Sequence, residues 1–485
     1  MIRKKIEKLI EEVVKKKVHL EHPANAEFGD YSTNLALTAK IDPEKIVSKL
    51  KDNSLFKKVT VAGPGFINFF LSQKALQEEL AEILKQGDDY GQLDINKNKK
   101  VQLEFISANP TGPLTVGNAR GGPFGDVLAN ILKKAGFKAA KAYYVNDTGQ
   151  QIVDLSQGKY KSDYLDNLKN KIGQKNLARY IVKDSIEPTT KRLGIKYDEW
   201  IFESDLHKSG RVEKALKYLR KKNLIYSKDG ADWFKSSKFG DQRDRVVVKK
   251  DGHKTYLAGD IALHQYKFED KKFDQVINIW GADHHGDIPG LMAAVEALGH
   301  KNKLEIILLQ FVTILEKGAK QKMSKRAGTY VEMDELLDKV GPDAVRFFFL
   351  QKSADTHLNF DLELAKEQSA KNPVYYVQYA QARICSILRK AGNLEAKLLS
   401  DLRQPAELSL IKKLVKFPEI IEETAQDYQV QRLPYYSLEL ANHFHKFYEQ
   451  CRVLGNPSRI SLIQATQIVL KSVLTLMGIK APKKM

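Results

Sequence analysis

KVQLEFISANPTGPLTVGNARGGPFGDVLANILKKAGFKAAKAYYVND, residues 100–147, is the stretch that decides the fold. It begins with alternating apolar residues, Val101, Leu103 and Phe105, which predict a strand. Apolar residues then recur at helical spacing, and Gly136 is placed to end that helix; they are Phe124, Val127, Leu128, Ile131 and Leu132. KAAKAYYVND supplies a second strand. Two strands joined by one such helix predict a parallel pair, which is typical of α/β folds that bind ligands at the carboxyl ends of their strands.

Two later apolar runs extend the predicted sheet. They are FDQVINIW and LEIILLQFVTIL, and the polar loops GADHHGD and KGAKQKMSKRAG follow them. After the first loop a helix is expected, with one apolar face made by Ile288, Leu291, Met292 and Val295. Residues 150–245 are strongly polar and mixed, which favours an insertion between two halves of the sheet over a separate domain.

Both ends of the chain have a different character. The opening helix, and VTVAGPGFINFFL with its Pro-Gly turn between two strand patterns, predict a small α+β unit. Towards the C-terminus strand signals fade and long helical patterns predict a bundle. We therefore expect three domains: residues 1–95, residues 96–365 with the insertion at 150–245, and residues 366–485.

The composition indicates the kind of partner. Lys and Arg number 79 against 60 Asp and Glu, a formal net charge of +19. This excess favours a polyanion, nucleic acid before an anionic membrane, although a basic protein can also simply be soluble. No apolar run approaches the roughly 20 residues that span a bilayer, so we expect a cytoplasmic protein without a membrane partner. Cys385 and Cys451 belong to no CxxC and predict free thiols.

Three polar loops are expected at one edge of the sheet: ISANPTGPLTVGN, GADHHGD and KQKMSKRAG. Four glycines of the first loop and the helix after it would let backbone approach a phosphate or a base; they are Gly112, Gly117, Gly121 and Gly122. A Walker loop and a GxGxxG fingerprint are both absent, which disfavours P-loop ATPases and dinucleotide binding. Lys322 and Lys325 suit a phosphate whose charge shifts during reaction, the alternative being a solvated basic turn.

These motifs resemble a known family. ANPTGPLTVGNARGG resembles the HIGH signature of class I aminoacyl-tRNA synthetases, and KMSKR resembles their KMSKS loop. Further motifs in the same order resemble the bacterial type of arginyl-tRNA synthetase: YYVNDTGQQI, TYLAGDIALH, INIWGADHHGDIPG and NPVYYVQYAQARICSIL. The resemblance covers nearly the whole chain. It includes AEFGDYSTNLAL and GPGFINFFL, in the small domain that this family places against the tRNA elbow.

The resemblance implies a fold and a reaction. The fold is an α/β Rossmann-like class I catalytic domain with a small N-terminal α+β domain and a C-terminal all-α anticodon-binding bundle. The reaction is ATP-dependent activation of L-arginine to arginyl-adenylate, then transfer to the 3′-terminal ribose of tRNA-Arg. ATP would be a substrate, Mg²⁺ would leave with pyrophosphate, and no protein side chain would bind the metal. Family analogy also implies a monomer whose activation step usually needs bound tRNA.

The resemblance assigns the arginine side chain to three residues. Glu104, Tyr256 and Asp260 match the family's guanidinium-recognising positions, and a planar guanidinium favours paired carboxylates. Tyr256 and Asp260 are four residues apart, so one helical turn can direct both at a ligand. From the residues alone, Asp260 could instead be an N-cap of the following helix, and Tyr256 a packed aromatic.

The remaining matched positions surround the reacting groups. Ser107, Asn109 and Asn118 match residues that hold the ammonium and carboxylate of the amino acid, and Asp283 and His284 match a set near the ligand. Of this set, His284 is assigned to the binding of arginine. The positions that match ATP-binding residues are Thr115, Gly117, Asn118, Asp283, Lys322, Met323 and Lys325. The His284–His285 pair could also suggest a metal, but the sequence places no third ligand nearby.

The signature departs from the family at its two histidines, which are Thr115 and Asn118 here. A Thr hydroxyl donates one hydrogen bond but carries no positive charge, and losing one preorganised donor typically lowers a rate ~10²–10³-fold. Our hypothesis is a working synthetase whose catalytic residues are these two with Lys322 and Lys325. The alternatives are a synthetase-like RNA-binding protein with weak or lost catalysis, and a class I synthetase for another amino acid.

Overall fold

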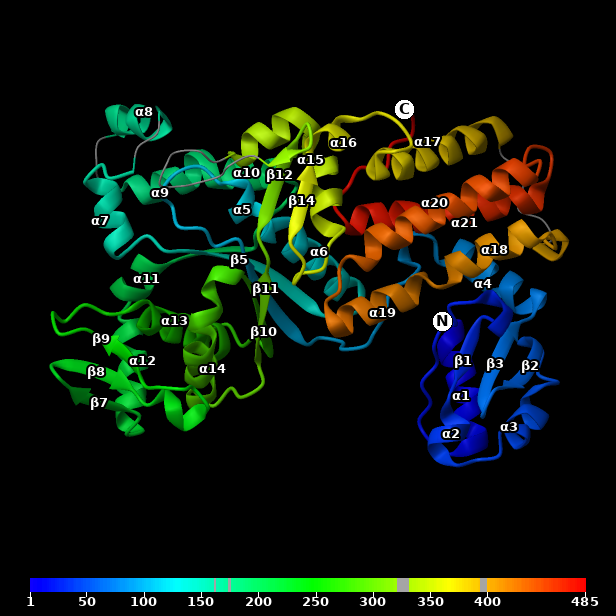
Figure 1. The fold of residues 1–485 in the computed structure, drawn as a ribbon, viewed down its shortest axis with the longest axis horizontal. Helices are drawn as coiled ribbons and strands as arrows, with labels where there is room; N and C mark the ends of the chain where they lie inside the picture. The colour runs from blue at the N-terminus through cyan, green and yellow to red at the C-terminus, as the bar shows by residue number, and fades with distance from the viewer. Residues whose placement is uncertain (161–162, 173–175, 321–330, 393–398) are drawn as a thin grey trace.

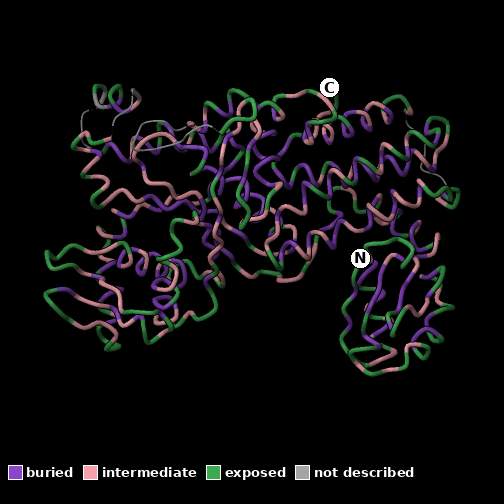
Figure 2. The backbone as a smooth tube through the Cα atoms, in the orientation of Figure 1, coloured by how far each residue is buried: buried purple, intermediate pink, exposed green. Residues whose placement is uncertain are grey.

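The computed structural model describes the chain except residues 161–162, 173–175, 321–330 and 393–398. Figure 1 shows three parts: a small blue N-terminal domain, a central region of sheets with flanking helices, and a bundle of yellow to red helices above the N-terminal domain. One continuous buried apolar cluster runs through the N-terminal domain, the central sheet and the bundle. The purple segments of Figure 2 follow this core.

The N-terminal domain is an α+β unit, as predicted. Its antiparallel sheet has the order β1-β3-β2, and β2 and β3 pair across the expected Pro-Gly turn. Helix α1 buries one face, Ile2, Ile6 and Ile10, and Ser72 caps α4. The elements are α1 Ile2–Val14, β1 Tyr31–Thr33, α2 Leu35–Ala39, α3 Pro43–Leu50, β2 Phe56–Ala62, β3 Phe66–Leu71 and α4 Gln73–Gln86.

The central sheet is the predicted parallel one. It has five strands in the order β11-β10-β4-β5-β6, and every neighbouring pair is parallel. The strands are β4 Lys100–Phe105, β5 Lys138–Val145, β6 Glu199–Phe202, β10 Gln275–Gly281 and β11 Leu304–Leu309. The order reverses between β4 and β10, and such a switch point is where α/β folds bind ligands beyond the carboxyl ends of the strands.

Three sequence expectations for this region were wrong. The polar segment 150–245 was expected to interrupt the sheet without contributing to it, but its strand β6 pairs with β5 and forms one edge of the sheet. LEIILLQFVTIL is not one strand: at Gln310, whose N–H donates to the carbonyl of Ala354, the chain leaves the sheet. Its second half, β12 (Val312–Glu316), pairs instead with β14 (Leu358–Asp361) and β13 (Ala319–Lys320). Met292 is exposed rather than on the buried face.

The helices of the βαβ unit explain its packing. The expected single helix is divided into α5 (Val116–Ala119) and α6 (Gly121–Lys134), and Gly136 follows its end with a φ of 102°. The predicted apolar face of α6 is buried against the sheet. On the other face lie α13 (Tyr256–Gln265) and α14 (Ile288–Ala297), and the latter is the helix expected after GADHHGD.

The polar segment also builds a satellite module beside the sheet, green in Figure 1. An antiparallel sheet of the order β7-β8-β9 packs with α11 to α14 around a separate buried cluster. Its elements from this segment are α11 Glu203–Lys208, α12 Arg211–Lys221, β7 Ile225–Lys228, β8 Ala231–Phe234 and β9 Arg245–Val248. The helices that precede them pack into the main apolar cluster instead; they are α7 Gln150–Ser156, α8 Asp163–Ile172, α9 Leu177–Ile181 and α10 Glu187–Arg192.

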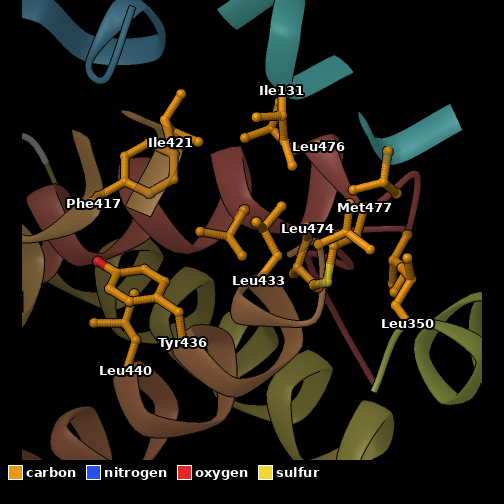
Figure 3. Close-up of a cluster of buried hydrophobic side chains, with 14 of the residues drawn as sticks. Ile131, Leu350, Phe417, Ile421, Leu433, Tyr436, Leu440, Leu474, Leu476 and Met477 are labelled. Carbon is orange, nitrogen blue, oxygen red and sulfur yellow. The ribbon is translucent and has the colours of Figure 1, made fainter. Parts of the chain in front are cut away.

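The C-terminal part is helical, as predicted. Its helices are α15 Met333–Leu350, α16 Leu362–Lys366, α17 Pro373–Ala391, α18 Pro405–Val415, α19 Phe417–Asp427, α20 Arg432–Gln450 and α21 Pro457–Leu476. In Figure 3, Ile131 of α6 lies beside Leu476 at the end of α21, so the bundle packs directly on a helix of the central sheet. Both cysteines are free and buried. Among the described helices, none is long and apolar enough to cross a membrane.

A buried charge network lies between α6, β5 and the bundle. Asp126 of α6 accepts from Lys141 Nζ at 2.5 Å and from Arg346 of α15 at 2.5 Å. Arg346 is fully buried and also donates to the carbonyls of Leu193 and Met477 at 2.8 and 2.6 Å. One carboxylate therefore balances two buried cations and joins the last turn of the bundle to the helix behind the ANPTGPLTVGN loop.

Replacing Asp126 by Ala should destabilise the protein by ~3–5 kcal/mol, because it leaves two buried cations without a counter-ion. Urea unfolding followed by tryptophan fluorescence measures this, since all three tryptophans lie between residues 200 and 280. The control is Asp88→Asn, which removes an exposed ion pair to Lys471 and should change stability by less than ~1 kcal/mol. Equal effects of the two changes would contradict the role of the buried network.

Candidate active site

A cavity of about 900 Å³ opens at the carboxyl ends of the central strands. Every site position matched to the family that the structure describes lines it: Glu104, Ser107, Asn109, Thr115, Gly117, Asn118, Tyr256, Asp260, Asp283 and His284. Lys322, Met323 and Lys325 lie outside the described residues. The sequence pattern therefore selected side chains that the fold gathers into one place.

The chain turns sharply where β4 ends. Ile106 and Ser107 both adopt left-handed backbone, with φ of 67° and 41°, at an energetic cost of ~1–3 kcal/mol each. The turn directs the Ser107 hydroxyl back to Glu104 Oε1, to which it donates at 3.2 Å, while it accepts from the Tyr144 N–H at 3.0 Å. Strained backbone of this kind is found where a site must be held in place.

Glu104 is buried and forms an ion pair with a buried lysine. Its Oε2 accepts from Lys267 Nζ at 2.5 Å, and the same ammonium donates to Asn278 Oδ1 at 3.2 Å. Lys267 belongs to a π-helical turn, Tyr266–Asp270, which continues α13 and is a conformation common at functional sites. The Asn278 amide nitrogen lies 3.0 Å from His264 Nε2. Burial, and then the positive charge of Lys267, keep the pKa of His264 well below its usual value. Glu104 is thus paired with a buried lysine.

Asp260 lies on the first turns of α13 and has no such partner. Among the described residues, no hydrogen bond or ion pair reaches its carboxylate. Burial, then the charges of Glu104 and Glu203, raises the pKa of Asp260 to about 8. The N-cap of α13 is Thr255, so Asp260 is not an N-cap, and Tyr256 is 54% exposed, so it is not a packed core aromatic. Both alternative interpretations of these residues are therefore wrong.

Asn109 belongs to a chain of amides at the rim. Its Nδ2 donates to Gln151 Oε1 at 2.7 Å, and its Oδ1 accepts from Asn146 Nδ2 at 3.0 Å. The chain joins the loop after β4 to the segment after β5 and to α7. It fixes which face of the Asn109 amide is turned to the cavity.

The two residues at the histidine positions of the signature contact each other. Thr115 is the N-cap of α5: its Oγ1 accepts from the Asn118 N–H at 3.3 Å and donates to Asn118 Oδ1 at 2.7 Å. This bond occupies the amide oxygen of Asn118, and its NH₂ group has no partner among the described residues. The Thr115 hydroxyl therefore orients the Asn118 amide, which then has two free donors at the cavity.

Backbone pairing ties this loop to the chain that follows residue 330. The Val116 N–H donates to the carbonyl of Val331 at 3.1 Å, and the Met333 N–H donates to that of Leu114 at 2.7 Å. Arg120, just after α5, donates to the carbonyls of Gln310, Phe311, Ser353 and Thr356. Burial lowers the pKa of Arg120 to about 10, which leaves it charged at neutral pH.

The glycines of the first loop divide into two groups. Gly112 and Gly117 face open space, where a Cβ would meet nothing closer than 4.0 Å. At Gly122 a Cβ would lie 2.8 Å from Ile195, and at Gly125 one would lie 2.3 Å from Phe105. The expectation that Gly122 allows a ligand to approach was therefore wrong. The absence of a side chain at Gly122 instead allows α6 to pack against Ile106 and Ile195.

Asp283 and His284 lie at the exposed rim, in a short 3-10 helix after β10. His284 Nδ1 is 3.5 Å from Asp287 Oδ2 and 3.9 Å separates its Nε2 from Asp283 Oδ2. In the part of the chain that the structure describes, no group of three or more His, Cys, Asp or Glu side chains could hold a metal ion.

Sequence reasoning missed two buried charges of the cavity region, Lys267 and Glu203. Glu203 directly follows the short apolar run EWIF, and an acid at the end of a predicted strand is a signal of a site residue. It was missed because the surrounding segment was interpreted as an insertion. Lys267 had no signal, because a lysine at the end of an amphipathic helix ordinarily faces solvent.

Comparisons with known proteins cover nearly the whole chain. Family models match residues 1–71 (arginyl tRNA synthetase N terminal domain), 79–170 and 156–384 (tRNA synthetases class I (R), catalytic domain) and 377–485 (DALR anticodon binding domain). An arginine–tRNA ligase of Carboxydothermus hydrogenoformans is 41% identical, with 96% of this chain and 94% of the relative covered. One of Bacillus subtilis is 40% identical at the same coverage. The fold of the Thermus thermophilus arginyl-tRNA synthetase matches over all of both chains, with a TM-score of 0.82 and 23% identity.

Gly125→Ala should cost ~2–3 kcal/mol of stability, because the added methyl overlaps the fully buried ring of Phe105 and α6 must move. The matched change is Gly117→Ala on the same stretch, where space is open and stability should stay within ~0.5 kcal/mol. Urea unfolding of both variants is the measurement. A larger loss for Gly117→Ala would mean that the two glycines have exchanged roles.

Proposed function

The chain belongs to the arginyl-tRNA synthetase family, and from that premise we propose which residues of the cavity carry out its reaction. It functions as an arginine–tRNA ligase, with arginine, ATP and tRNA-Arg as its substrates. The comparisons give no support to an RNA-binding protein without catalysis. The observation that carries the residue assignment is the convergence of the signature loop and two carboxylates from separate segments, Glu104 and Asp260, on one cavity.

The guanidinium of arginine is proposed to lie between Glu104, Asp260 and Tyr256. Glu104 is held by Lys267 and Ser107 and presents a fixed acceptor. Asp260 is the carboxylate without a cation, so an incoming guanidinium supplies its missing partner through charge-assisted hydrogen bonds. Lysine would satisfy only part of this arrangement, because an ammonium cannot bond two carboxylates in a planar fork.

The α-ammonium and α-carboxylate of arginine are proposed to contact Asn109 and Asn118, with Ser107 and His284 beside them. Ser107 already makes two hydrogen bonds within the protein, so its main contribution is to hold Glu104 in position. The reaction joins the arginine carboxylate oxygen to the α-phosphate of ATP. The reaction therefore requires the arginine side chain to lie at Asp260 and the arginine carboxylate to lie towards the signature loop, where ATP is proposed to bind.

ATP is proposed to lie against Thr115, Gly117, Asn118 and Asp283. The exposed Gly117 allows a phosphate to approach the backbone, and the free amide donors of Asn118 supply hydrogen bonds to it. Lys322, Met323 and Lys325 are proposed to close over the phosphates. The described side chains offer no cluster for a cation, so Mg²⁺ would be held by phosphate oxygens and water, as is usual for this ion.

The other two parts are proposed to bind tRNA. Residues 1–95 would contact the tRNA elbow, and residues 366–485 would bind the anticodon, which agrees with the net charge of +19. The central region would then be the catalytic domain of residues 96–365. We further propose a monomer in the cytoplasm.

ATP–pyrophosphate exchange with arginine and cognate tRNA tests the site. The protein should exchange with arginine and not with lysine. Asp260→Asn should lower kcat/KM for arginine by roughly 10²-fold or more, since it removes one partner of a buried charged pair. Exchange that is independent of arginine, or an Asp260→Asn variant with unchanged kcat/KM, would refute the assignment.

The Thr115–Asn118 pair has its own test. Asn118→Ala should lower kcat of exchange by ~10²–10³-fold, because it removes donors aimed at the phosphate. Thr115→Val, which releases the amide orientation and removes the N-cap bond of α5, should have a smaller effect, and Thr115→Ser should retain most activity. If Thr115→Val lowered kcat more than Asn118→Ala, the hydroxyl rather than the amide would be the phosphate donor.

A further inference from the structure

Two buried polar side chains of the cavity wall have no part in the reaction assigned above, His264 of α13 and Asn278 of β10. Both line the cavity, and they are only 1% and 0% exposed. Every side-chain nitrogen and oxygen atom of the two residues has a hydrogen-bond partner within the protein. An effect of either residue on a substrate therefore passes through these partners.

The direction of each hydrogen bond follows from the backbone carbonyl at one end. His264 Nδ1 lies 2.7 Å from the carbonyl oxygen of Asp260, which can only accept, so Nδ1 carries the hydrogen. Burial, and then the charge of Lys267, keep the pKa of His264 well below its usual value, so the ring is neutral and Nε2 accepts. Asn278 Nδ2, 3.0 Å from Nε2, is then the donor. The tautomer of one histidine thereby fixes the orientation of the neighbouring amide.

The orientation of the Asn278 amide decides what the buried ammonium of Lys267 contacts. With Nδ2 bonded to His264, the amide oxygen Oδ1 accepts from Lys267 Nζ at 3.2 Å. The opposite orientation would place the NH₂ group against the ammonium, and both groups only donate. Lys267 Nζ also donates to Glu104 Oε2 at 2.5 Å. Four hydrogen bonds therefore form an unbroken chain from the carbonyl of Asp260 to the carboxylate of Glu104.

The chain connects the elements that carry the proposed guanidinium partners. Asn278 and Glu104 are register partners in the parallel pair β10 and β4, so their side chains leave the same face of the sheet. Asp260 and His264 lie four residues apart on α13, and Lys267 lies in the π-helical turn that continues this helix. The chain is buried at every side chain, and buried hydrogen bonds are stronger than those exposed to water. It thus fixes the strand relative to the helix beside the two carboxylates.

We propose that His264 and Asn278 are positioning residues for arginine recognition, which act through Lys267 to hold the carboxylate of Glu104 at a fixed place relative to Asp260. This rests on the assignment of the guanidinium to Glu104 and Asp260. A planar guanidinium binds best when its acceptors are already in place, and supporting hydrogen bonds provide that order. Because the signature loop is held by other contacts, loss of the chain should weaken the binding of arginine and spare that of ATP.

ATP–pyrophosphate exchange with cognate tRNA tests the role of His264. His264→Phe fills the space of the imidazole but leaves the Asn278 amide without its acceptor, so KM for arginine should rise by roughly 10- to 100-fold. The values of kcat and of KM for ATP should stay within about threefold of wild type, because binding is lost away from the reacting atoms. His264→Gln places an amide oxygen near the position of Nε2, and this conservative change should keep KM for arginine within about threefold of wild type.

The matched control is His300→Phe. The His300 ring stacks on Phe268, the residue after Lys267, with 4.6 Å between the ring centroids. Neither ring nitrogen of His300 has a hydrogen-bond partner in the described structure. The same exchange of side chains is therefore made close to the chain but outside it, and KM for arginine should stay within about twofold of wild type.

A double-mutant cycle tests whether His264 acts through Glu104. Glu104→Gln removes a proposed guanidinium partner and should raise KM for arginine at least as much as His264→Phe does. Adding His264→Phe to Glu104→Gln should then change KM by less than about twofold, because the carboxylate that the chain holds is already lost. Residues that act independently would instead multiply their effects.

Nitrogen-15 NMR of the imidazole rings tests the chain in the wild-type protein. The signals of His264, identified by their loss in His264→Gln, should be those of a neutral ring with its hydrogen on Nδ1 at pH 7. A charged ring, or a hydrogen on Nε2, would refute the chain of hydrogen bonds without any need for a kinetic measurement.

The kinetic outcomes separate this inference from the assignment on which it rests. If Glu104→Gln raises KM for arginine but His264→Phe does not, or if the two effects multiply, the inference is overturned and the assignment of the pocket stands. A loss in His264→Phe that falls equally on kcat and on KM for ATP would show a general structural role and overturn it as well. If Glu104→Gln leaves KM for arginine unchanged, the guanidinium assignment fails and this inference fails with it.

Discussion

The buried ion pair between Glu104 and Lys267 is the interaction on which the cavity depends. Charges so far from water are stable only when paired and further hydrogen bonded, and both conditions are met here by Ser107 and Asn278. The pair joins the end of β4 to the π-helical turn after α13, and thereby sets the distance between the sheet and the helix that carries Asp260. It also fixes the charge of the cavity. With Glu104 already paired with Lys267, the carboxylate that has no partner among the described residues is that of Asp260, which under the proposed assignment would bind the guanidinium of arginine.

A second constraint holds the signature loop. Thr115 caps α5, the backbone of residues 114 and 116 pairs with that of residues 331 and 333, and Arg120 gathers carbonyls from two other segments. Hydrogen bonds therefore join the loop to residues 331–333 and to the chain just before β12. Behind them, Asp126 links α6 to α15 and to the end of α21. A rearrangement of the bundle would reach the signature loop through packed, charged contacts.

The sequence predicted this architecture where local patterns and packing agree. The βαβ unit, the loops at the strand ends and the helical C-terminal part follow from periodicity, and every predicted site residue that the structure describes lines the cavity. Prediction from the sequence failed where tertiary contacts override the local pattern. β6 is four residues long and lies in polar surroundings, so only pairing with β5 makes it a strand. Gly122 was assigned to ligand approach because a glycine needed for helix packing looks the same in sequence. Lys267 is buried only because Glu104 is opposite, a fact that no local pattern contains.

Strand order separates the two kinds of charge that the reaction brings together. Glu104 stands at the end of β4 and Asp260 on α13, whereas Arg120 donates to the carbonyls of Gln310 and Phe311 just after β11. Phosphates would be repelled by uncompensated carboxylates at close range, where little water screens them. The reversal of strand order between β4 and β10 opens a crevice in which, under the proposed assignment, the arginine carboxylate and the α-phosphate of ATP would meet.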